Sequence, residues 1–204
     1  MPPSEHGALF SLRRTGGVRI LRMQSGDGMN RLTRARVAAL TDAIDGMATD
    51  PMPLIITGNE KFFSVGADLR EIAALTSPAA YEFSRLGQRL MKAVEDFPVP
   101  VCAAICGYCM GGGLDLALAC HYRIVSPSAI FGHRGAALGL ITGWGGTQRL
   151  SRLIGKAPAL HMFVAAEKID AQSASQSGLV NRVAKDPLRA ALQFGRDHGT
   201  LTES

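Results

Sequence analysis

The sequence predicts an α/β fold in which parallel strands alternate with helices. Three features indicate it: short apolar runs typical of buried strands, amphipathic stretches with three- and four-residue spacing, and glycine-bearing turns between them. Repeated strand, turn and helix units imply right-handed crossovers and parallel pairing. The 204 residues contain no linker, low-complexity segment or repeat, so we expect a single domain over 1–204.

The N-terminal elements follow from local patterns. Residues 8–14 and 18–23 are expected to form two strands, joined by a turn at 15–17 where glycine permits positive φ. Apolar residues recur every three or four positions over 33–48, which predicts an amphipathic helix. The continuous apolar run at 53–58 is typical of a buried parallel strand.

The later elements follow from the same criteria. A helix over 78–96 is closed by Pro98 and Pro100. The other expected elements are a strand at 101–105, a helix at 112–120, a strand at 122–126, and a helical region from 147 to about 196 that contains a strand at 179–183.

Composition and charge exclude several classes of protein. The hydrophobic fraction of 47% excludes disorder as the main state. The net charge of +5 comes from scattered Lys and Arg, which argues against nucleic acid as a partner and suits an anionic small molecule such as a phosphorylated cofactor. Glycines and Asp115 interrupt the apolar stretch 99–120, so we expect no membrane span. Residues 1–7 lack a secretory pattern, and a cytoplasmic location is expected.

All four cysteines fall in that same apolar stretch, at Cys102, Cys106, Cys109 and Cys120. Cys106 and Cys109 have CxxC spacing, but no second pair or histidine cluster completes a metal site. We therefore expect no metal and interpret the thiols as structural, with a redox or metal role as the alternative.

Two glycine-bearing turns, at 61–70 and 105–116, lie where an expected strand leads into an expected helix. Backbone N–H groups at such turns lack intrahelical partners, so two of them can bind one oxygen as it gains negative charge. The alternative is that the glycines only permit tight packing. Asp115 follows Gly112 by three residues and shares its helical face. That acidic residue could serve proton transfer, or only complement the helix dipole.

Several motifs together resemble one family. Residues 63–69 are similar to the F-x-x-G-A-D segment of the enoyl-CoA hydratase/isomerase family, in the crotonase superfamily, and 107–115 to its G-x-x-x-G-G-G-x-E segment. Two further stretches match, at 129–150 and 171–180. The resemblance covers most of the chain in unbroken order.

The resemblance implies a crotonase-like spiral of ββα units, with a core over 1–185 and a short helical part over 186–204. It implies an acyl-CoA thioester as substrate, no cofactor beyond coenzyme A, a role in fatty acid metabolism, and a homotrimer or hexamer. The amides of Ala67 and Gly112 would form the oxyanion hole. The remaining substrate-binding residues implied are Asp68, Leu69, Arg70, Gly111, Gly135 and Trp144; for Trp144, core packing is an equal alternative.

The sequence departs from the family at both acid/base positions. Asp115 replaces the first of two glutamates, and Gly135, which cannot transfer a proton, replaces the second. Either Asp115 acts alone, or His133 substitutes as a proton carrier, or Gly135 leaves room for a bound anion. The last occurs in the family's dihydroxynaphthoyl-CoA synthases, one subgroup of which also has glycine at this position. The rest of that subgroup's pattern is missing, because this chain has Thr142 where the subgroup has an acidic residue. For His133, a solvated surface residue is the more frequent outcome.

His121 stands where the family commonly has aspartate. We expect a structural role, with the charged ring favoured by a helix C-terminus. The leading hypothesis for the whole chain is an enoyl-CoA hydratase or isomerase with Asp115 as acid/base. The competing hypothesis is a non-catalytic acyl-CoA-binding relative.

Overall fold

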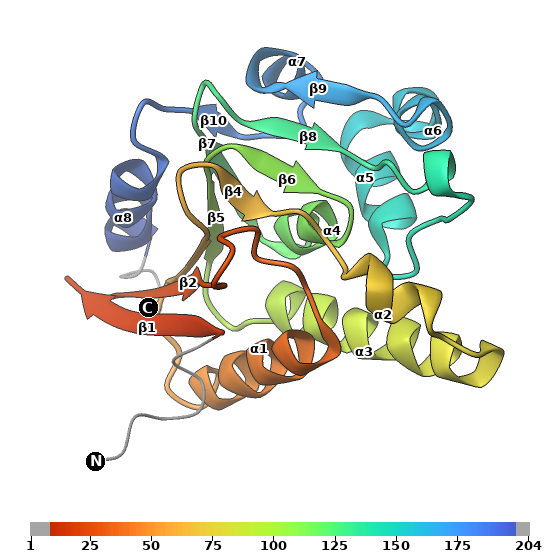
Figure 1. The fold of residues 1–204 in the computed structure, drawn as a ribbon. Helices are drawn as coiled ribbons and strands as arrows, with labels where there is room; N and C mark the ends of the chain where they lie inside the picture. The colour runs from red at the N-terminus through yellow and green to blue at the C-terminus, as the bar shows by residue number, and fades with distance from the viewer. Residues whose placement is uncertain (1–8, 199–204) are drawn as a thin grey trace.

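Two β-sheets organise residues 9–198, the part of the chain that the computed structural model describes (Figure 1). The larger sheet has the order β1-β2-β3-β5-β7-β10 and the smaller one the order β4-β6-β8-β9. The larger sheet contains β1 (Phe10–Thr15), β2 (Val18–Met23), β3 (Leu54–Thr57), β5 (Val101–Ile105), β7 (Tyr122–Val125) and β10 (Arg182–Val183). The smaller sheet contains β4 (Phe62–Ser64), β6 (Tyr108–Met110), β8 (Ile130–Gly132) and β9 (Lys168–Asp170).

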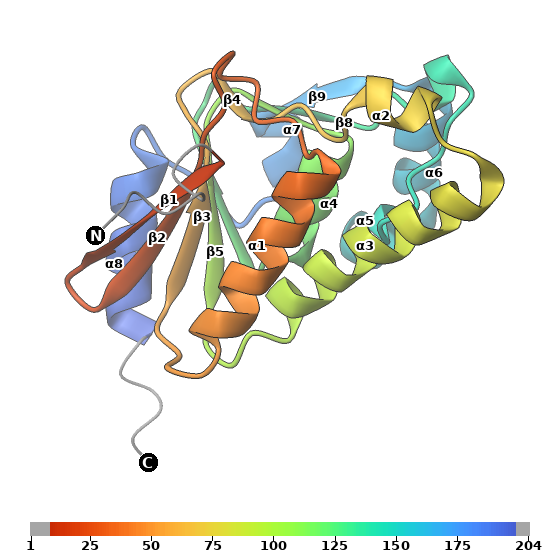
Figure 2. The same ribbon diagram turned by 60° about the horizontal axis from the view of Figure 1, so that its bottom comes forward.

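Helices cover both faces of the larger sheet. The helices are α1 (Arg34–Met47), α2 (Leu69–Ala73), α3 (Ser77–Glu95), α4 (Gly112–Ala119), α5 (Gly146–Ile154), α6 (Lys156–Ala165), α7 (Ala171–Gln176) and α8 (Pro187–His198). Figure 2 shows α1 and α3 on one side of the larger sheet and α8 on the other. Helix α4 packs against β4 and β6 and against α3 and α5, so it joins the smaller sheet to the helical layer.

Burial on both faces explains the continuous apolar runs of the central strands. All five residues of β5 are buried. Cys102 and Ala104 point toward α8, where they pack with Ala191 and Phe194. The centroid of the Phe194 ring lies 4.3 Å from that of the Tyr122 ring. The alternate residues of the strand belong to the main core, on the side of α1 and α3.

The predicted N-terminal elements are confirmed with small shifts. The hairpin turn has Gly16 at φ 55° and Gly17 at φ 79°, the two positive angles that a two-residue hairpin requires. Residue 8 of the expected first strand lies outside the described residues. Helix α1 begins after Thr33, whose hydroxyl accepts a hydrogen bond of 3.2 Å from the Arg36 N–H.

The smaller sheet was not predicted. Its strands are three residues long, too short for a period-two pattern. Strands β4 and β6 lie in the segments that we interpreted as turns, and β9 lies in the region expected to be helical. The strand expected at 179–183 is also wrong over its first half. The Leu179 and Val180 N–H groups both donate to the Ala174 carbonyl, at 2.9 and 3.2 Å, and so end α7 instead of pairing with β7.

Residues 9–198 form one α/β domain in which α8 packs on the larger sheet. The division into a spiral core and a short helical part stays a prediction. In the described residues, no helix is long and apolar enough to cross a membrane.

Candidate active site

A cavity of about 590 Å³ lies where the two glycine-bearing turns meet. One part of its wall is apolar and comes from α2, the segment after it, and α3, with Ile72, Leu75 and Phe83. Another part carries Tyr108 and Lys168 from the smaller sheet. The Lys168 ammonium lies 5.4 Å from the centroid of the Tyr108 ring. An apolar surface with a few polar groups is typical of a small-molecule site.

The amide nitrogens of Ala67 and Gly112 lie close together at this cavity. A Cβ built on Gly112 would be 3.5 Å from the Ala67 nitrogen, and one built on Gly66 would be 2.9 Å from the Gly112 nitrogen. Gly66 has φ 90°, and a side chain there would meet the Met110 carbonyl oxygen at 2.7 Å. Glycine is therefore needed for the two turns to approach.

Neither the Ala67 N–H nor the Gly112 N–H donates to another protein group within residues 9–198. At Gly112 the reason is geometric, since it is the first residue of α4 and has no acceptor one turn before it. The turn is held by its neighbours: the Gly111 N–H donates to the Gly132 carbonyl at 2.9 Å. Both Ala67 and Gly112 line the cavity.

Buried hydrogen bonds hold the turn that carries Ala67. The Ser64 hydroxyl accepts from the Gly66 N–H at 3.1 Å and donates to the Asn30 carbonyl at 2.8 Å. The Asn30 side chain donates to the carbonyls of Phe62 and Phe63, and the Leu32 N–H donates to the Gly66 carbonyl at 2.9 Å. These contacts fix the path of the backbone into the cavity.

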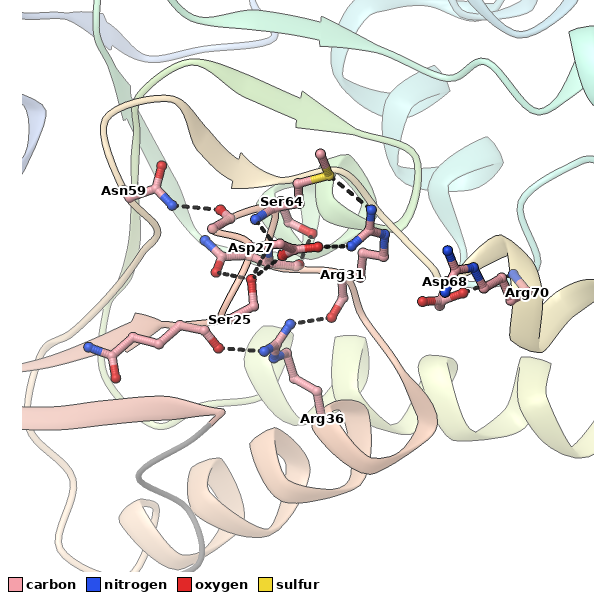
Figure 3. A network of polar contacts seen from close by, with 12 residues as sticks. Ser25, Asp27, Arg31, Arg36, Asn59, Ser64, Asp68 and Arg70 are labelled. Carbon is pink, nitrogen blue, oxygen red and sulfur yellow. Dashed lines mark hydrogen bonds and ion pairs between the residues drawn. The ribbon is translucent and has the colours of Figure 1, made fainter.

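The loop before α1 supports this arrangement from outside (Figure 3). The Asp27 carboxylate accepts from the Met29 N–H and the Ser25 hydroxyl and pairs with Arg31; these contacts, led by the backbone one, lower the pKa of Asp27 to about 2. The Arg36 guanidinium donates to the carbonyls of Arg31 and Gln24. Burial lowers the pKa of Arg36.

The predicted substrate-binding segment 67–70 divides in two. Ala67 and Leu69 line the cavity, whereas Asp68 and Arg70 do not. The Asp68 carboxylate accepts a 2.8 Å hydrogen bond from the Arg70 N–H and caps α2 (Figure 3). Contact of these two residues with coenzyme A stays a prediction.

Asp115 is fully buried and lines the cavity. Its Oδ2 atom accepts a hydrogen bond from the Thr142 hydroxyl, and its Oδ1 atom lies 2.9 Å from Nε2 of His133. Oδ1 and Nε2 are close but not aligned as a hydrogen bond, and neither has another partner. Gly146 leaves the space for this contact, since a Cβ there would overlap Oδ1.

His133 is 4% exposed, so the interpretation of a solvated surface residue is wrong. Its ring packs on Phe163 of α6, with centroids 4.9 Å apart, and α6 was not resolved in the sequence pattern. His133 and Gly135 both line the cavity, although the segment is not extended: β8 ends at Gly132, and Gly135 opens a 3-10 turn over Ala136–Leu138.

Trp144 is both a wall of the cavity and a core residue. Its indole N–H donates to the Phe83 carbonyl at 3.2 Å, and its ring occupies the space beside Gly87 and Gly112. Gly111 also lines the cavity. The core-packing interpretation of Trp144 fits these contacts, and its contact with an acyl chain stays a prediction.

His121 lies away from the cavity and joins three elements. The Val101 N–H donates to its Nδ1 atom at 2.9 Å, and its Nε2 atom lies 3.1 Å from the Glu95 carbonyl oxygen. Because Nδ1 accepts a hydrogen bond, it carries no proton, so the ring is neutral and Nε2 donates. The expectation of a charged ring is wrong, while the structural role fits this geometry.

The four cysteines are free thiols. Burial raises the pKa of Cys102 to about 12 and also raises the pKa of Cys106, Cys109 and Cys120. Thiols held in the neutral form are poor nucleophiles and metal ligands. Residues 9–198 contain no group of three side chains suited to hold a metal ion.

Residues missed by sequence reasoning include Ser64 and Asn30, which hold the Ala67 turn, and Gly146, which leaves room for the Asp115–His133 contact. Gly146 lies within a matched motif, so its position was visible in the sequence. Its reason was not, because the two side chains that it accommodates come from distant segments.

Two sheets, with a buried carboxylate beside paired glycine turns, define a crotonase-type protein. The chain matches the enoyl-CoA hydratase/isomerase family over residues 13–192 and belongs to that family. The crotonyl-CoA hydratase of Syntrophomonas wolfei is 40% identical over 158 residues, which are 76% of this chain and 61% of that protein. The chain thus spans less than two thirds of that relative's length.

Solved structures agree with the assignment. Pseudomonas aeruginosa DspI has a TM-score of 0.89 at 33% identity, covering 95% of this chain and 82% of that one. The enoyl-CoA hydratase of Bacillus anthracis has a TM-score of 0.87 at 33% identity, covering 92% of this chain and 75% of that one. The crotonase-like fold that the motifs implied is confirmed.

Proposed function

We propose that this chain binds an acyl-CoA thioester and stabilises its enolate in a two-amide oxyanion hole, as an enoyl-CoA hydratase or isomerase. The observation that carries the proposal is the approach of the Ala67 and Gly112 amides at one cavity, with both N–H groups free of protein acceptors. Two such donors aimed at one thioester oxygen would stabilise the negative charge that develops there.

The acid/base group of the proposal is Asp115, one helical turn beyond Gly112 on α4. A proton acceptor at this place lies near the carbon next to the thioester carbonyl when that carbonyl oxygen is held by the two amides. In isomerisation, one base removes a proton from C2 and returns it to C4 while the double bond shifts. In hydration, the oxygen of water bonds to C3 and remains there as a hydroxyl, while the proton that the water releases is delivered to C2.

The shape of the cavity supports an acyl chain as the second part of the ligand. The apolar wall from α2 and α3 suits a hydrocarbon tail, and Lys168 near the other wall suits an anionic carrier. The proposal requires no cofactor beyond the coenzyme A of the substrate. We also propose the homotrimer or hexamer that the family resemblance implies.

Purified protein assayed with crotonyl-CoA and with a 3-enoyl-CoA tests the proposal. We expect turnover of at least one substrate and a loss of 100-fold or more in Asp115→Asn, the order expected for removal of a general acid/base. Asp45→Asn, at an exposed position of α1, is the matched control. Coenzyme A affinity is measured in parallel by calorimetry.

One observation favours a second function. Gly135 cannot transfer a proton, which leaves a single carboxylate at the proposed centre. A non-catalytic acyl-CoA-binding protein would show micromolar affinity and no turnover of either substrate. That result would replace the enzyme by the binding protein.

A further inference from the structure

The position occupied by Gly135 offers no proton-transferring group, yet a titratable ring lies two residues earlier on the same cavity wall. His133 is 4% exposed and packs with one face against Phe163. Its Nε2 edge faces Oδ1 of Asp115 at 2.9 Å. The two side chains are thus one buried unit, held between α4 and the segment that follows β8.

A purely structural role explains this unit poorly. Oδ1 and Nε2 are both enclosed, and neither makes an aligned hydrogen bond within residues 9–198. A buried polar group left in this state costs free energy, which a structural pair avoids by good alignment. Poor alignment before substrate binds is common in catalytic pairs, which tighten in the substrate complex.

The contact with Asp115 engages one ring nitrogen of His133 and leaves the other for the substrate. The Thr142 hydroxyl donates to Oδ2 of Asp115, so the carboxylate presents Oδ1 to His133. In the tautomer that carries its hydrogen on Nε2, the nitrogen beside Oδ1, the Nδ1 atom has a lone pair. No hydrogen bond of Nδ1 is found among the described residues, and the His133 side chain lines both this cavity and an adjoining one. Besides Asp115, the charged groups that line this cavity are Arg134 and Lys168, and Lys156 lines an adjoining cavity.

We infer that His133 and Asp115 act as one acid/base unit in which Nδ1 of His133 exchanges the proton with the substrate. The inference rests on the proposed function. In hydration, the water oxygen forms its bond to C3 while its proton moves to Nδ1, and the C2–C3 π electrons move into the enolate. Nδ1–H then gives the proton to C2. The sum is addition of one water, and the unit returns to its starting state.

In this step Asp115 is a positioning residue, which changes the role of direct acid/base that the proposed function gives it. Its carboxylate orients the ring through Nε2 and stabilises the positive charge that the ring carries between the two proton transfers. His133 thus takes the role of the family's second glutamate, although the sequence position of that glutamate is occupied by Gly135.

The test compares His133→Gln with wild type, using crotonyl-CoA and a 3-enoyl-CoA. We expect kcat to fall by about 100-fold or more, because a general base contributes 10²–10⁴-fold, while KM stays within about threefold. His161→Gln is the matched control, since His161 is an exposed histidine of α6 whose side chain is 68% accessible. Its kcat is expected to equal that of wild type.

A second variant separates catalysis from structure. His133→Ala leaves a space beside the cavity, and added imidazole is expected to restore kcat in a saturable manner without changing the melting temperature. An unchanged kcat in His133→Gln, or a loss in His133→Ala that imidazole does not restore, overturns the inference while the proposed function stands. Wild-type protein inactive on both substrates overturns the proposed function, and the inference with it.

Discussion

The indole ring of Trp144 lies directly against Gly112, the first residue of α4. A Cβ on Gly112 would overlap Cζ3 of the ring and lie 2.7 Å from Cε3. The ring cannot retreat freely, because it also fills the space beside Gly87 and its N–H is bonded to the Phe83 carbonyl. The Gly112 amide can therefore keep its position beside the cavity only if residue 112 has no side chain.

Gly112→Ala should consequently move either the ring or the start of α4, and with it the N–H proposed to hold the thioester oxygen. We expect kcat to fall by about 100- to 1000-fold, the effect of removing one oxyanion donor. The measurement is steady-state kinetics with crotonyl-CoA, together with the circular-dichroism spectrum.

Gly46→Ala is the control for this substitution, since a Cβ there meets no atom within 4 Å on the exposed side of α1. It should stabilise the protein by about 0.5–1 kcal/mol and leave kcat unchanged. Full activity in Gly112→Ala would contradict the assignment of this amide.

Gly146→Ala tests the Asp115–His133 contact without altering either side chain. The new Cβ would overlap Oδ1 of Asp115 and lie 3.1 Å from Nε2 of His133, so the two groups must separate. We expect kcat to fall by about 100-fold with little change in coenzyme A affinity, measured by calorimetry. Parallel loss of affinity and kcat would indicate a general collapse of the cavity instead.

The sequence predicted those elements that depend on residues close together in the chain. The hairpin depends on Gly16 and Gly17, and β5 was placed at its observed bounds because five buried residues lie between Pro100 and the following turn. The spacing of Gly112 and Asp115 likewise placed both at one cavity wall.

The remainder depends on contacts between distant segments. The smaller sheet consists of three-residue strands that gain their stability only by pairing, and such strands carry no pattern of their own. His133 is buried in part by the ring of Phe163 in α6, which lies 30 residues later in the chain. Sequence reasoning named His133 as a candidate, but its surroundings could come only from the fold.

Ser64→Ala is predicted to loosen the turn that carries Ala67. The substitution removes the acceptor of the Gly66 N–H and the donor to the Asn30 carbonyl, both in a buried region. An unsatisfied buried group costs about 1–3 kcal/mol, so the free energy of unfolding in urea should fall by at least that amount.

Ser175→Ala, at an exposed position of α7 without a side-chain hydrogen bond in the described structure, should change the free energy of unfolding by less than about 0.5 kcal/mol. Equal stability of the two variants would show that the Ser64 hydroxyl does not hold the turn.

The buried thiols predict how stability depends on alkaline pH. Burial raises the pKa of Cys102 from 9.0 to about 12 in the folded protein. The unfolded chain then loses the Cys102 proton at lower pH than the folded protein does. The contribution of the protonated thiol to the free energy of unfolding is therefore complete below pH 9.0 and is lost as pH rises toward 12. The greatest slope is about 1.4 kcal/mol per pH unit for each such thiol.

Urea unfolding of wild type and Cys102→Ala between pH 8 and 11 isolates this thiol, because other alkaline groups titrate alike in both proteins. The free energy of unfolding should fall less steeply with pH in the variant. Parallel pH dependences would mean that Cys102 ionises equally in the folded and unfolded states.

Restoring a carboxylate at residue 135 should not increase activity. A Cβ on Gly135 would lie 2.7 Å from the Leu140 carbonyl oxygen. The Gly135 carbonyl also accepts from the N–H groups of Leu138 and Leu140, at 2.8 and 2.9 Å, which limits how far the backbone can move. Gly135→Glu should therefore lower the melting temperature and leave kcat at or below the wild-type value.

Gly135→Ala makes the same contact with Leu140 without a carboxylate, so it should lower the melting temperature by a similar amount. If steric contact governs this position, the two variants behave alike in stability and neither exceeds wild-type activity. A Gly135→Glu protein faster than wild type would mean that the loop yields to the side chain. The acid/base centre would then be able to work with the added carboxylate beside His133.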